Sequence, residues 1–145
     1  NLDTWLSKLN TTIDDLIYIF DNDFICGLER ILTNNIEKDS PFKAFKHKTT
    51  ILYIYNNSSW KKATKNHLKK IMSKIQLDIL QRDSEYSRTL DEHHIFGSNN
   101  IEYLQNNRKI MITNLKLKER CYKNISKNII NIVKTELNMI RFNTL

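Results

Sequence analysis

The residues that most resemble a catalytic or metal-binding site are Asp-Glu-His-His at positions 91–94. Histidines and carboxylates bind divalent metals, and a histidine beside an acid can serve as a general base. Adjacent residues point in different directions, however, so this run needs partners from elsewhere in the chain. The other histidines, His47 and His67, stand among lysines, which disfavour a bound cation. We expect a solvated loop here, and a metal-dependent nuclease that uses His93 or His94 is the catalytic alternative.

Recognisable catalytic motifs are absent from the rest of the sequence. It contains no HExxH, CxxC, Walker loop or GxSxG. Two glycines cannot easily form a loop that cradles a nucleotide. Cys26 and Cys121 lie far apart, in neither a disulfide framework nor a metal-ligand spacing, and are expected to pack as small core residues in a protein of a reducing compartment. The sequence therefore predicts a non-enzymatic protein with no cofactor and no metal.

Charge is the most informative feature, because it is segregated along the chain. Residues 1–40 carry three basic and eight acidic side chains. Residues 41–80 carry nine lysines and the single acid Asp78, and residues 101–145 carry nine basic and three acidic groups. A basic field of this kind indicates an anionic partner, either nucleic acid or an acidic protein surface.

The basic block alternates with the aromatic residues Phe45, Tyr53, Tyr55 and Trp60. Such a surface could contact phosphates without reading bases, and binding would then weaken steeply with salt. The alternative is that the aromatic residues are core and the lysines only keep the protein soluble. Lysine outnumbers arginine 17 to 6, which codon bias in an AT-rich genome would also produce. The candidate nucleic-acid-binding residues are Lys43, Lys46, Lys48, Lys61, Lys62, Lys65, Lys69, Lys70 and Lys74.

A change of hydrophobic period predicts a small antiparallel sheet between residues 42 and 60. Residues 42–46 and 49–55 alternate in a β-rich composition and are expected to pair through a turn at 46–48. A second turn at 56–59 would return Trp60 as a short third strand. Thr64 then begins a helix with one apolar stripe and one lysine face. We expect an α+β fold, mainly helical, with a β-hairpin or three-stranded sheet and a long C-terminal helix or helix pair.

The acidic N-terminal part shows three helix signals. Asp3 is expected to cap a first short helix, and Thr12 to begin a second through a capping box. The run 21–23, Asp-Asn-Asp, marks a kink or break, and Gly27 marks a close helix crossing. The only proline, Pro41, ends this part of the chain.

The second half reads as a loop followed by helix. Residues 82–100 are polar and are expected to form a loop with one short helix. Residues 101–142 contain neither glycine nor proline and predict one long helix, or two joined near 118–123. One domain is expected, with an acidic helical part (1–38), a basic hairpin–helix part (41–82) and a basic C-terminal helical part (100–142).

The basic C-terminal helix gives the second function hypothesis. Its cations could extend the phosphate-binding surface, or they could dock an acidic partner. That partner could be the acidic residues 1–40 of a second copy, which would make a homo-oligomer. The longest apolar run, residues 51–55, is too short to span a membrane. Because residue 1 is Asn, we expect a piece of a longer protein.

Residues 15–79 contain a run of core-type residues in helix–hairpin–helix order: Phe20, Gly27-Leu28, Ile31-Leu32, Pro41-Phe42-Lys43-Ala44-Phe45, Leu52-Tyr53-Ile54-Tyr55, Trp60, Leu68 and Ile75. On these residues the stretch resembles an accessory domain of uncharacterised proteins of large nucleocytoplasmic DNA viruses. The resemblance implies a viral, non-enzymatic module found beside coiled-coil or DNA-binding segments, and it assigns no site residue. With the cysteine usage, it would give an intracellular, reducing location, in the host cytoplasm, the viral factory or the virion.

Overall fold

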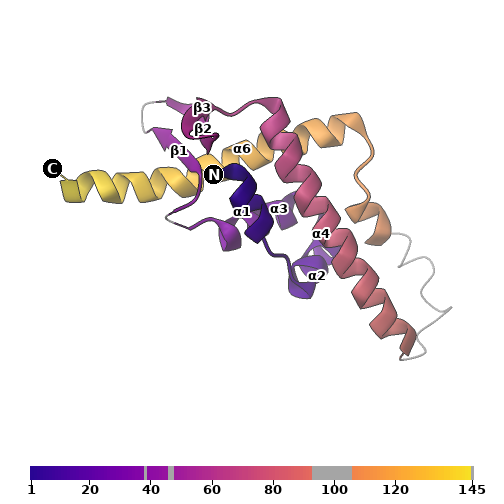
Figure 1. Ribbon diagram of the computed structural model, residues 1–145. Helices are drawn as coiled ribbons and strands as arrows, with labels where there is room; N and C mark the ends of the chain where they lie inside the picture. The colour runs from indigo at the N-terminus through magenta and orange to yellow at the C-terminus, as the bar shows by residue number, and fades with distance from the viewer. Residues whose placement is uncertain (38, 46–47, 93–105, 145) are drawn as a thin grey trace.

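The computed structural model describes residues 1–37, 39–45, 48–92 and 106–144, with side chains for all of these except 48–49, 90–92 and 135–144. Helices form most of the molecule, and a three-stranded antiparallel sheet lies at one end of it (Figure 1). The predicted α+β class is confirmed. The elements are α1 (Leu2–Lys8), α2 (Ile13–Asp21), α3 (Phe24–Asn35), β1 (Phe42–Phe45), β2 (Lys48–Asn56), β3 (Ser59–Lys62), α4 (Lys65–Glu92) and α6 (Leu115–Thr144).

The N-terminal helices begin at side chains that accept hydrogen bonds from the backbone. The predicted capping box at Thr12 is confirmed, since its hydroxyl accepts from the Asp15 N–H at 3.1 Å and the Asp15 carboxylate accepts from the Thr12 N–H at 2.9 Å. The break after α2 is confirmed too, and Asp23 caps α3. The prediction for Asp3 is wrong. Asn1 caps α1, and this leaves Asp3 inside the first turn, where a carboxylate is favoured by the helix dipole.

The crossing of α2 and α3 depends on Gly27, as predicted. A Cβ built at this position would lie 2.2 Å from Cγ1 and 2.8 Å from Cδ1 of Ile19. Ile19 is fully buried. The two helices therefore approach more closely than any side chain at position 27 allows without moving Ile19.

The sheet has the order β1-β2-β3, and the predicted third strand is confirmed. Phe42 pairs with Ile54, and Tyr55 pairs with Trp60. Asn57 and Ser58 connect β2 to β3 with φ angles of 51° and 63°. Two residues of positive φ are what a two-residue hairpin needs to match the twist of its strands. The turn expected at 46–48 lies partly outside the described residues.

Helix α4 is longer than predicted, because it continues to Glu92. The expectation of a loop is therefore wrong for residues 82–92. Tyr86 supplies the apolar contact that the polar composition conceals, since its ring lies 6.3 Å from that of Phe20 in α2. An ion pair from Arg82 to Glu85, at 3.1 Å, supports the same turn of helix. Residues 93–100 of the expected loop lie outside the described residues.

The C-terminal helices separate earlier than predicted. Residues 106–110 are helical and 111–114 are not. Asn114 then caps α6 by accepting from the Lys116 N–H at 2.8 Å, so the expected junction near 118–123 is wrong. The segment before α6 is anchored, since Lys109 donates to the Phe20 carbonyl and Gln76 donates to the Ile110 carbonyl.

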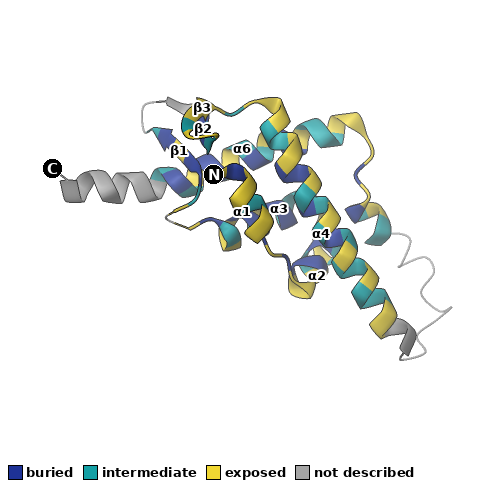
Figure 2. Ribbon diagram, in the orientation of Figure 1, coloured by how far each residue is buried: buried dark blue, intermediate teal, exposed yellow. Residues whose placement is uncertain are grey.

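Helix α6 organises the core. It packs on α3, α4 and the inner faces of β1 and β2, and its buried stripe includes Ile125, Ile129 and Val133 (Figure 2). Cys121 of the same helix is fully buried, as predicted, whereas Cys26 is only partly buried.

Helix α1 closes one side of the sheet through Trp5. Its ring meets that of Phe42 edge-on at 4.8 Å, and its indole N–H donates to the Asn35 carbonyl at 3.0 Å. Trp5 thereby joins the sheet to the end of α3.

Candidate nucleic-acid interface

The two faces of the sheet differ in chemistry. Phe42, Leu52 and Ile54 are buried on the inner face. Lys43, Tyr53 and Lys62 are paired across the three strands and therefore share the opposite, outer face. Alternation of side chains along a strand produces this division. The outer face thus carries cations and aromatic rings together.

The aromatic residues of the outer face contact one another and a lysine. The rings of Tyr55 and Trp60 lie 5.2 Å apart, and those of Phe45 and Tyr53 lie 5.5 Å apart. The ammonium of Lys43 lies 4.3 Å from the centroid of the Trp60 ring, within cation–π distance. Trp60 is 39% exposed and the other three are partly buried. The alternative that these rings are core residues is therefore wrong for Trp60. We call Lys43, Tyr53, Tyr55, Trp60 and Lys62 the aromatic–lysine face.

Three of the four lysines on the lysine face of α4 form ion pairs with acidic side chains, which the sequence did not predict. Lys65 forms an ion pair with Glu119 of α6. Lys70 lies 3.9 Å from Asp3 of α1, and Lys74 lies 3.0 Å from Asp78 one turn along α4. Only the Lys74 pair has i,i+4 spacing, which a sequence can reveal. Asp3 and Glu119 reach the helix through tertiary packing.

Four of the predicted lysines remain available to an anionic ligand. Lys43, Lys61, Lys62 and Lys69 are exposed, and among the described residues none has a carboxylate within 4.0 Å. Lys46 lies outside the described residues. Lys48 pairs with Phe45 through its backbone, but its side chain is not among those described.

Two lysines of α6 lie beside Lys65, in agreement with the expectation that the C-terminal helix could extend the basic surface. Lys123 and Lys127 are exposed and line a shallow hollow with Lys65, Thr50 and Tyr122. A second hollow lies between α1 and α4 and is lined by Leu6, Ser7, Asn66, Lys69, Lys70, Ser73, Lys74 and Leu77. The basic residues thus occupy the outer face of the sheet and both flanks of α4, not one continuous ridge.

A histidine capping box joins the sheet to α4. Thr64 caps the helix, as predicted, and its hydroxyl accepts from the His67 N–H at 3.3 Å. In return, the Thr64 N–H donates to Nδ1 of His67 at 3.0 Å, so Nδ1 must be unprotonated. Burial, followed by the charges of Lys70 and Lys61, lowers the pKa of His67. Lys61 at the end of β3 therefore lies close to the beginning of α4.

We expect this cap to make folding stability depend on pH. The pKa of His67 is lower in the folded protein than in the unfolded chain, where it is about 6.5. The neutral histidine therefore contributes its full share of the free energy of unfolding above about pH 6.5, and this share is lost as pH falls through the pKa of the folded protein. Loss of one cap costs about 1 kcal/mol. Urea unfolding of wild type and His67→Gln at a series of pH values measures this. Glutamine keeps an acceptor at the same position but does not titrate, so equal pH dependence of the two proteins would contradict the prediction.

The expected absence of a metal site is not tested at residues 91–94, whose side chains lie outside those described. Among the described side chains, no group of three histidine, cysteine, aspartate or glutamate residues could hold a metal ion. Within the same described part, no helix is long and apolar enough to cross a membrane. Comparison of the chain with protein-family models, with curated proteins and with solved structures found no match.

Proposed function

We propose that this protein is a non-enzymatic module that binds nucleic acid through phosphate contacts from exposed lysines. The observation that carries the proposal is that Lys43, Lys61, Lys62 and Lys69 are exposed and have no carboxylate within 4.0 Å among the described residues. A lysine already paired with an acid must lose that partner before it can neutralise a phosphate. An unpaired lysine contributes its whole charge.

Salt-dependent binding is the direct test. Fluorescence anisotropy of labelled duplex and single-stranded oligonucleotides, titrated with protein at several salt concentrations, gives the affinity and its log–log salt slope. Each phosphate contact contributes about −0.7 to −0.9 to that slope. We expect a slope of about −2 to −4, since four unpaired lysines carry the proposal. Absence of binding at low salt would overturn it.

A matched pair of triple variants tests the residues. We expect Lys61→Gln, Lys62→Gln and Lys69→Gln together to weaken binding at least about tenfold on every nucleic-acid sequence and to reduce the salt slope by about 2 to 3. The control replaces the three paired lysines, Lys65, Lys70 and Lys74, with glutamine. Both triple variants lose three positive charges. If only the overall charge of the protein attracted nucleic acid, binding would weaken equally in both. Equal losses of affinity in the two triple variants would contradict the proposal that the unpaired lysines are the ones that contact phosphates.

The alternative is a structural or assembly module that docks an acidic protein surface through α6. It is favoured by Leu115 and Met111, which are 71% and 49% exposed at and just before the start of this helix. Exposed cations at Lys116, Lys123 and Lys127 follow them. Mass measured across a concentration series separates the two proposals, because a tight dimer that ignores nucleic acid would favour assembly. On the resemblance of residues 15–79 we propose that either module belongs to a viral protein, and on the cysteine usage that it lies in a reducing compartment.

A further inference from the structure

The aromatic–lysine face has a chemistry that phosphate binding does not require. Lysines alone would neutralise phosphates, yet four aromatic side chains lie on the same face, and Trp60 is exposed at the edge strand. A cluster of rings that includes an exposed tryptophan offers a surface on which a flat aromatic ligand can stack. Lys43 and Lys62 on the same face are exposed and Trp60 is 39% exposed, so a ligand can approach this face.

The two tyrosines of β2 are spaced more widely than successive bases of a duplex. Tyr53 and Tyr55 are two residues apart on one strand, a separation of about 6.6 Å. Successive bases in a duplex rise by about 3.4 Å. Two successive bases that each stack on one of these rings must therefore lose the stacking between them, and the unpaired bases of a single strand can do so.

The cations lie where stacked nucleotides would need them. Lys43 crosses the face from β1 and places its ammonium over the ring of Trp60 on β3. Lys62 lies on the same face, across β2 from Lys43. A base stacked beside Trp60 or Tyr53 would bring its phosphate close to one of these two ammonium groups. Aromatic rings combined with a positively charged track are the means by which proteins bind single strands without sequence preference.

We infer that the aromatic–lysine face binds single-stranded nucleic acid by stacking unpaired bases on Trp60, Tyr55 and Tyr53 while Lys43 and Lys62 neutralise their phosphates. This inference rests on the proposed function and narrows its ligand to single strands. It also predicts that the bases contribute to the binding free energy in addition to the phosphates.

Three probes of equal length test the inference: an oligothymidine, an abasic deoxyribose-phosphate strand and a duplex. The first two carry the same charge and differ only in the bases. We expect the oligothymidine to bind about five- to a hundredfold more tightly than the abasic strand, the range of one stacked base. Equal affinity for these two probes would overturn the inference and leave phosphate binding standing. Absence of binding to all three would overturn both.

Substitutions at Trp60 identify the ring that stacks. We expect Trp60→Val to weaken oligothymidine binding about five- to a hundredfold, with an unchanged salt slope and unchanged abasic binding. Valine suits a strand, and Trp60→Phe, which keeps a ring, should retain most of the affinity. Conversely, Lys62→Gln should weaken binding of both probes. Wild-type affinity in Trp60→Val would overturn the role of this ring.

A second measurement needs no substitution that might impair folding. The chain has two tryptophans, and the indole N–H of Trp5 is hydrogen-bonded inside the protein. In a proton–nitrogen NMR spectrum, oligothymidine should shift the indole signal of Trp60 and leave that of Trp5 in place. A Trp60 signal that responds equally to the abasic strand would count against base stacking.

Discussion

Replacing Gly27 with valine is expected to lower the free energy of unfolding by about 3 kcal/mol, because the new side chain has no space at the crossing of α2 and α3. Even the first carbon added would lie 2.2 Å from Cγ1 of Ile19. Ile19 is fully buried in a close-packed core and cannot move aside without displacing its neighbours. Chemical denaturation measures the loss.

A compensating substitution separates this steric effect from other costs of valine in a helix. Ile19→Ala removes three carbon atoms, and Gly27→Val adds three at the same contact. Ile19→Ala alone should cost about 2–5 kcal/mol by leaving a cavity. If the crossing is the cause, the double variant should be more stable than the sum of the two losses by at least about 1 kcal/mol. Additive losses would contradict the steric account.

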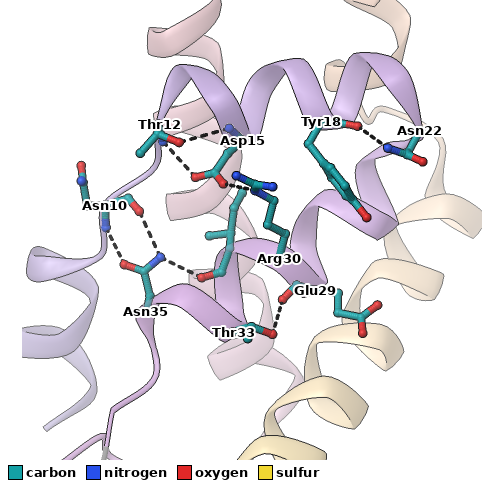
Figure 3. Close-up of polar contacts among 10 residues, drawn as sticks. Asn10, Thr12, Asp15, Tyr18, Asn22, Glu29, Arg30, Thr33 and Asn35 are labelled. Carbon is teal, nitrogen blue, oxygen red and sulfur yellow. Dashed lines mark hydrogen bonds and ion pairs between the residues drawn. The ribbon is translucent and has the colours of Figure 1, made fainter.

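Replacing Asp15 with alanine is expected to lower the free energy of unfolding by about 2–4 kcal/mol. One carboxylate oxygen accepts from the Thr12 N–H at 2.9 Å, and the other accepts from Nε of Arg30 at 2.9 Å (Figure 3). The Asp15 side chain is only 3% exposed, whereas that of Arg30 is 40% exposed. Alanine therefore removes both a helix cap and the buried half of an ion pair. Urea denaturation measures the loss.

Two further variants divide that loss between the cap and the ion pair. Asp15→Asn keeps an oxygen that can accept from the Thr12 N–H but removes the negative charge. It should cost about 1–2 kcal/mol, less than alanine. Arg30→Met keeps the stem of the side chain and removes its charge, so a double-mutant cycle with Asp15→Asn isolates the pair. A loss below about 0.5 kcal/mol in Asp15→Ala would contradict the role assigned to this carboxylate.

The elements that the sequence predicted correctly are those with a local signal. The capping box at Thr12, the break before Asp23 and the three strands each follow from residues close together in the chain. The continuation of α4 to Glu92 was missed because its last turns are mostly polar. Their apolar contact, Tyr86 against Phe20, joins residues far apart in the sequence.

The same distinction applies to the candidate interface. The sequence placed Lys65 and Lys70 among the candidate phosphate ligands, but tertiary packing brings Glu119 and Asp3 to them. The shared face of Lys43, Tyr53 and Lys62 depends on the register of three strands. A shift of one residue would have turned Tyr53 inward, and the sequence alone did not fix that register.

The burial of Cys121 has a consequence for the chemistry of the folded chain. Removal from solvent raises the pKa of this thiol to about 11, so at neutral pH it is both enclosed and protonated. An alkylating reagent can reach it only after α6 separates from the helices that pack on it. The rate at which Cys121 is trapped would therefore record how often the centre of the protein opens under native conditions. Cys26, which is partly exposed in α3, provides the comparison within the same molecule.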